Sequence, residues 1–167
     1  MDFRAEVRAH ADVLVDGWLR EDVYDSDGAV RSRIGGMEIV PSEALSEFGC
    51  RLLDFLADEQ EDGLQNWLRT DSLAGYASQV VLHAAQCLIG RVRVHIRQRL
   101  EVQPGITPAA AVAVMETLWQ STDQLYRDVL DHQLRLSRDA MPEDGSDFQD
   151  LASVVKDTLY STLSSGL

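Results

Sequence analysis

The chain has few of the residues that build disulfide-bonded, zinc-bound or membrane-spanning proteins. Its two cysteines, Cys50 and Cys87, lie 37 residues apart without a Cys-x-x-Cys spacing. This spacing argues against a disulfide framework or a cysteine zinc site, so we expect buried thiols that act as small apolar groups. No apolar run approaches the roughly 18 residues of a membrane span, and the charged start Met1–Glu6 is unlike a signal peptide. We therefore expect a cytoplasmic protein without a membrane partner.

Positive charge is also scarce. The 167 residues include 28 acidic and 15 basic ones, which gives a formal net charge of -13, and Lys156 is the single lysine. Such an acidic surface repels phosphate backbones, so no nucleic-acid partner is expected. The basic run Arg91–Arg99 is a local exception. It either offsets the negative end of a helix dipole or forms a site for an anionic partner.

Catalytic and nucleotide-binding motifs are missing from the sequence: it contains no phosphate loop, G-x-G-x-x-G, H-E-x-x-H or G-x-S-x-G. The stretch Asp25–Gly28 is similar to part of a calcium loop. With Gly28 at the sixth position, however, Val23 and Ile34 would be the first and twelfth ligands, and neither has a side-chain oxygen. Because no acid, base and nucleophile converge, the sequence predicts a protein that is not an enzyme and has no resident metal.

Apolar periodicity predicts an all-α protein. The spacing of apolar residues indicates a first helix over residues 2–21, a second from Pro41–Ser42 to Leu56, and a short one around Trp67. Two long helices dominate the remainder. We expect the first of them over Ser72–Leu100, with a cap at Asp71–Ser72, and the second over Thr107–Arg138, where Thr107–Pro108 is a typical helix start. A capping box at Ser146 predicts an extra C-terminal helix over residues 146–164.

His83 is the histidine with the most apolar sequence neighbours. It lies between Val80–Leu82 and Ala84–Ala85 on the first long helix. Two interpretations stay open: a hydrogen-bonded histidine at the edge of the core, or a ligand of haem iron or a contact for a small molecule. The other three histidines, His10, His95 and His132, are expected to be exposed or marginally buried.

The order of these elements resembles the N-terminal sensor domain of RsbR-type stressosome proteins. The resemblance covers roughly residues 1–140. It rests on Val13–Leu19 in the first helix, on Glu47–Leu56, on Leu82–Leu100 with its Ala-x-Gln start, and on Leu118–Arg138. The family's phosphorylatable C-terminal domain has no counterpart here, and the helix at 146–164 is not explained by the resemblance.

The resemblance implies a globin-like helical bundle that acts without haem as a sensory or regulatory module. Residues 1–167 would then form one such domain, working as a homodimer with a regulatory protein partner. Some related globin sensors carry haem, so the alternative is a gas or redox sensor with His83 as proximal ligand. The family pairs its subunits through the long last helix, and we expect the dimer interface at Met115, Trp119, Leu125, Tyr126 and Val129.

Overall fold

A computed structural model describes residues 1–23, 40–58, 61–70, 73 and 76–139, and these residues form helices and turns without a strand. This confirms the predicted all-α class, while the likeness to globins stays a prediction. The predicted helix at 146–164 lies outside the described residues. The helices are α1 (Phe3–Ala9), α2 (Ala11–Trp18), the π-helical η1 (Leu19–Val23), α3 (Ser42–Asp58), α4 (Glu61–Thr70), α5 (Ser78–Val102) and α6 (Pro108–Asp139).

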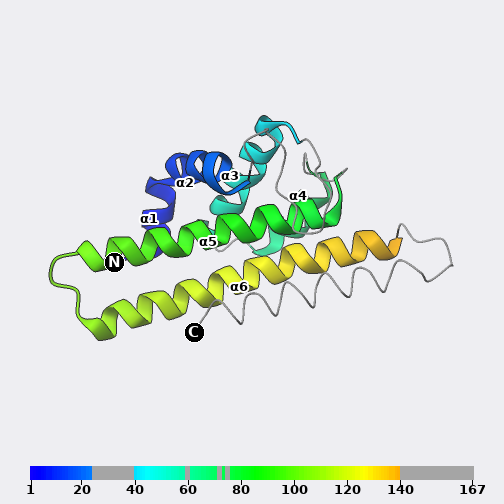
Figure 1. The fold of residues 1–167 in the computed structure, drawn as a ribbon. Helices are drawn as coiled ribbons and strands as arrows, with labels where there is room; N and C mark the ends of the chain where they lie inside the picture. The colour runs from blue at the N-terminus through cyan, green and yellow to red at the C-terminus, as the bar shows by residue number, and fades with distance from the viewer. Residues whose placement is uncertain (24–39, 59–60, 71–72, 74–75, 140–167) are drawn as a thin grey trace. The chain divides into compact units, whose positions relative to one another are not determined.

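Residue contacts divide the chain into two compact units, Met1–Gln133 and Leu134–Leu167. The described part of the second unit is the end of α6, and the other described residues belong to the first. There, α1, α2 and α3 pack against α5, and α6 runs antiparallel to α5 along its other side (Figure 1). Buried side chains from the six α-helices join in one hydrophobic core. Within the described part of the chain, none of the helices has both the length and the apolar character that crossing a membrane requires.

The N-terminal segment is broken at His10, whereas the periodicity predicted one helix over residues 2–21. The backbone of His10 leaves the helical region (φ -123°, ψ 17°), and its amide donates to the carbonyl of Val7 instead of continuing the α-helical pattern. The imidazole Nδ1 lies 3.0 Å from the carbonyl oxygen of Glu6. The side chain thus satisfies a carbonyl that the helix end would leave without a partner. A new helix then begins at Ala11.

The first long helix begins later than predicted. We expected a cap at Asp71–Ser72, but α5 starts at Ser78 with Ala77 as its N-cap residue, so this boundary was wrong. Leu73 is buried, and its carbonyl accepts a hydrogen bond from the amide of Tyr76, which makes a turn before the helix. The sequence has Gly75 at this point, and glycine is costly inside a helix. Leu73 is therefore buried in the core ahead of the helix, and the helix begins five residues later, at Ser78.

The start of the second long helix is confirmed. Pro108 is the first residue of α6, and the Thr107 hydroxyl accepts a hydrogen bond from the Ala110 amide at 3.2 Å. Proline fits the first helical position because the amide it lacks would have no intrahelical partner there. The helix continues to Asp139, one residue beyond the predicted end, and is about 48 Å long at 1.5 Å per residue.

Candidate functional site

The predicted interface residues differ in exposure. Leu125 and Val129 are buried in the chain's own core, and Met115 and Tyr126 are half-buried against it. Burial raises the pKa of the Tyr126 phenol to about 12. Of these five residues only Trp119 is exposed, at 42% of its surface. The stripe that periodicity identified on α6 is therefore mostly the face that packs within the chain, and Trp119 is the member that can contact a partner.

Trp119 is held in place from α5. The Arg93 guanidinium lies over the indole ring, with Cζ 3.6 Å from the ring centroid, which is a cation–π contact. Its Nη2 also donates to the Thr122 hydroxyl at 2.7 Å. Burial lowers the pKa of Arg93, and the adjacent Asp123 carboxylate opposes this shift. The Arg93 guanidinium is held by Thr122 and Asp123, and its contact with the indole orders the Trp119 side chain. Trp119 therefore presents a pre-organised apolar surface.

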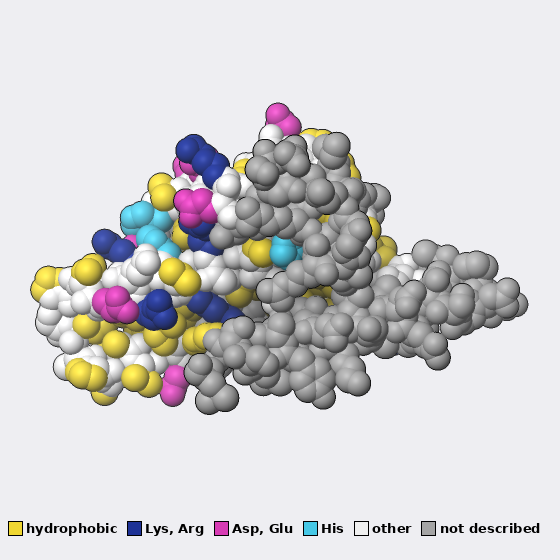
Figure 2. Space-filling view, viewed as in Figure 1, with side chains coloured by type: hydrophobic (Ala, Val, Ile, Leu, Met, Phe, Trp, Pro, Cys, Tyr) yellow, Lys and Arg dark blue, Asp and Glu magenta, His cyan; other side chains and the backbone are white. Residues whose placement is uncertain are grey.

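Apolar side chains gather on the surface where α5 and α6 meet. From residue 102 to residue 115 the sequence has no charged side chain. Val102 is 69% exposed and Val112 is 56% exposed, and Figure 2 shows hydrophobic side chains over this end of the two helices. Val112 and Trp119 are seven residues apart, so both point to the same side of α6. We call this the hairpin surface, and it comprises Val102, Ala109, Ala110, Val112, Ala113 and Trp119.

His83 is half-buried on α5, one helical turn before Cys87. The Cys87 sulfur lies 3.6 Å from the imidazole Nε2 and 3.8 Å from Nδ1, so a thiol stands against the ring. The two similar distances place the sulfur over the face of the ring rather than on the lone-pair axis of either nitrogen. Haem ligation by His83 stays a prediction.

Neither cysteine is in a disulfide, and both are half-buried rather than fully buried, which corrects the expectation for them. Cys50 lines an open hollow of about 750 Å³ between α2 and α3, together with Asp16, Arg20 and Glu47. Burial raises the pKa of the Cys50 thiol, and the negative charges of Asp12 and Asp54 add to this effect. The thiol is therefore kept protonated, which makes it a poor nucleophile and metal ligand.

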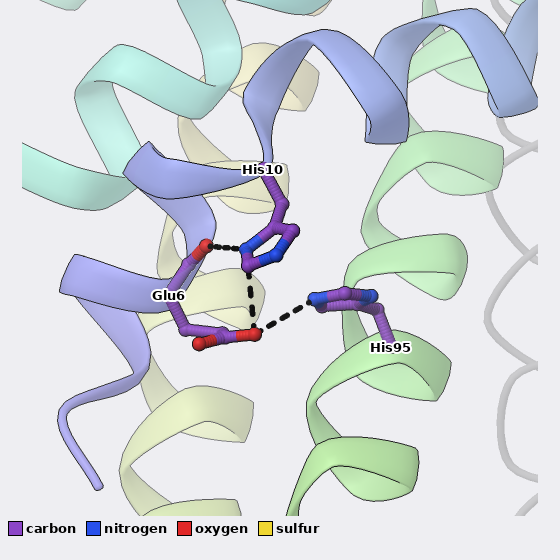
Figure 3. A group of neighbouring side chains, drawn as sticks. All are labelled: Glu6, His10 and His95. Carbon is purple, nitrogen blue, oxygen red and sulfur yellow. Dashed lines mark hydrogen bonds and ion pairs between the residues drawn. The ribbon is translucent and has the colours of Figure 1, made fainter.

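A polar cluster joins α1 to α5 at the break in the N-terminal helix (Figure 3). Oε1 of Glu6 lies 3.3 Å from His10 Nδ1, 3.3 Å from His95 Nε2 and 2.6 Å from Arg99 Nε. The two imidazole rings are 5.1 Å apart between centroids. Glu6 is only 13% exposed, whereas the histidines are half-buried. One carboxylate oxygen thus lies within 3.3 Å of a nitrogen atom from each of three side chains.

This cluster was missed in the sequence. Glu6 and His10 are four residues apart, and that spacing places two side chains on one helix face. Nothing in the sequence, however, indicates that His95, 85 residues after His10, would join them. His10 and His95 are half-buried, which agrees with marginal burial. His132 is buried at 3% exposure, so the expectation for that histidine was wrong.

Comparisons of the chain with protein-family models, with curated proteins and with solved structures found no match.

Proposed function

We propose that this protein is a non-enzymatic regulatory domain that works as a homodimer, in the manner of the RsbR-type sensor domains that its sequence resembles. The observation that carries the proposal is the hairpin surface. It combines exposed valines, an ordered exposed tryptophan and a run without charge on a strongly acidic chain. The occupant that we assign to this surface is a second copy of the chain.

Charge explains why the surface suits a second copy. Two molecules with a net charge of -13 repel each other, and like charges brought face to face cost several kcal/mol. In a two-fold symmetric dimer the same patch lies on both sides of the interface. The stretch from residue 102 to residue 115 brings no charged side chain to the contact, which limits that repulsion, and the charges next to Trp119 are Glu116 and the ion pair of Arg93 with Asp123. Ordered aromatic side chains such as Trp119 are the residues that contribute most to such interfaces.

The long helix α6 gives the proposed dimer a route for regulation. One end of α6 carries the hairpin surface, and its middle buries Leu118, Leu125 and Val129 against the rest of the first unit. A ligand or protein partner that binds one packing arrangement of α6 better than another shifts the population of the two arrangements. The change would reach the dimer contact through the same helix, which is how a module without catalytic groups can transmit a signal.

Trp119→Glu tests the proposal. We expect this variant to raise the dimer dissociation constant at least about tenfold, because it places two carboxylates at the symmetric contact. Val13→Glu is the matched control, since Val13 is 67% exposed on α2 and the substitution adds the same charge. Ala113→Glu is a second variant, which leaves the contact between Arg93 and Trp119 intact. Sedimentation velocity over a hundredfold range of concentration gives the dimer dissociation constants of the wild type and of the three variants.

Circular dichroism of each variant confirms that it is folded before its dissociation constant is compared with wild type. If Trp119→Glu and Ala113→Glu dimerise as tightly as Val13→Glu, the hairpin surface is not the interface.

A further inference from the structure

The polar cluster of Glu6, His10 and His95 also has the composition of a metal site. Two imidazole nitrogens and one carboxylate oxygen form a donor set that zinc and other divalent first-row metals accept. The three donor atoms lie within 4.8 Å of one another, and among the described residues this is the group of histidine and acidic side chains that could hold an ion. Glu6 and His10 come from the end of α1, and His95 comes from α5, so the donors converge from opposite sides (Figure 3).

The spacing of the donors matches a tetrahedral ion. Zinc binds imidazole nitrogen and carboxylate oxygen at about 2.0–2.2 Å, which places neighbouring ligands of a tetrahedron about 3.4 Å apart. The distances from Glu6 Oε1 to His10 Nδ1 and to His95 Nε2 are both 3.3 Å. Two of the three edges of the ligand triangle therefore have the required length already. The third edge, between the two histidines, is at most 4.8 Å, so the half-buried rings would have to turn toward each other to bind one ion.

Arg99 acts as the competitor for this site. Its Nε lies 2.6 Å from the same carboxylate oxygen that would bind the ion, so the guanidinium supplies the positive charge when no metal is present. The Arg99 side chain is about half exposed and can move into solvent. An ion at His10 Nδ1 also replaces the contact of this nitrogen with the Glu6 carbonyl. Metal binding would thus replace two contacts, the ion pair of Arg99 with the Glu6 carboxylate and the contact of His10 with the Glu6 carbonyl.

We propose that Glu6, His10 and His95 bind a divalent transition-metal ion of the zinc type, with Arg99 taking its place in the metal-free state. Three protein ligands leave a fourth position for water or an external ligand. The ion would link the end of α1, where the helix is broken at His10, to α5. This site is independent of the hairpin surface and does not rest on the proposed dimer.

Calorimetric titration of the full chain with Zn²⁺ tests this proposal. We expect one ion per chain, and His10→Gln and His95→Gln should each weaken binding at least about tenfold. Arg99→Gln should tighten binding by up to about fivefold, because it removes an exposed ion pair that competes with the metal. Opposite effects from neighbouring substitutions are not expected of non-specific binding to an acidic surface.

His83→Gln and Cys87→Ala are the matched controls, since they remove the other histidine and thiol contact on α5 and should leave the affinity unchanged. Cobalt(II) gives a second measurement: we expect visible d–d bands without the near-ultraviolet charge-transfer band of a thiolate ligand. Zinc should also raise the melting temperature of the wild type, by about 5–10 °C at a hundredfold excess over Kd, and not that of His10→Gln. Absence of binding to the wild type, wild-type affinity in either histidine variant, or loss of binding in Cys87→Ala would overturn the proposal.

Discussion

Replacement of Trp18 with alanine is expected to lower the free energy of unfolding by about 3–5 kcal/mol. Trp18 ends α2 and is completely buried in the core, between α2 and α3. Removing the indole leaves a cavity that the surrounding helices fill only in part, which adds to the lost burial of apolar surface. Denaturation of wild type and variant in urea at equal protein concentration measures the difference.

Gly49 on α3 explains how the indole comes so close to the neighbouring helix. A Cβ atom at this position would lie 2.7 Å from Cζ3 of Trp18, nearer than packed carbons approach, and the indole ring cannot bend away. We therefore expect Gly49→Ala to cost about 1–3 kcal/mol in the wild type. In the Trp18→Ala background the two closest atoms are gone and Val15 Cγ2 remains at 3.3 Å, so the same substitution should cost clearly less than in the wild type.

Gly90 on α5 is the control for this double-mutant cycle. It is exposed, and nothing lies within 4 Å of an added Cβ, so Gly90→Ala should stabilise the protein by about 0.5–1 kcal/mol through helix propensity alone. If Gly49→Ala behaves like Gly90→Ala in the wild type, the close contact between α2 and α3 does not exist in solution.

Alkaline pH is expected to destabilise the protein through Tyr126. Burial raises the pKa of this phenol from 10.0 to about 12 in the folded state, so the folded chain keeps a proton that the unfolded chain loses first. The stabilisation is complete below pH 10 and is lost as the pH rises from about 10 to about 12. A shift of two pKa units corresponds to a loss of up to about 2–3 kcal/mol over this window.

Tyr126→Phe isolates this contribution, because phenylalanine has no titrating group. We expect the free energy of unfolding of the variant to fall less steeply above pH 10 than that of the wild type, measured by urea denaturation at a series of pH values. The raised pKa of Cys50 acts in the same direction but is present in both proteins, so it cancels in the difference. Parallel pH profiles would show that the Tyr126 hydroxyl is not protected from water.

The sequence predicted the helical elements better than their ends. The start of α6 was predictable because a threonine cap followed by proline is a local signal. The break at His10 was not, because apolar spacing continues across it and the imidazole contact that satisfies the end of α1 depends on side-chain conformation. The start of α5 was missed for a related reason: Asp71–Ser72 has the composition of a cap, but burial of Leu73 decides where the helix can begin.

The surface features were harder to predict than the core. Periodicity identified the stripe of α6 that contains Leu125 and Val129, but it cannot say whether such a stripe packs within the chain or against a partner. Both residues are buried in the chain's own core here. The cluster around Glu6 depends on a contact with His95, which lies 89 residues away. Contacts of that range follow from tertiary packing and carry no signal in one sequence.

Sedimentation equilibrium of the wild-type protein tests the central claim, that the chain works as a homodimer, most directly. The chain has a mass of 18.6 kDa, and the account predicts a species of twice that mass at micromolar concentration. High salt should preserve this species, because the stretch from residue 102 to residue 115 has no charged side chain and apolar burial supplies most of the affinity. A mass of one chain throughout the concentration range would contradict the account.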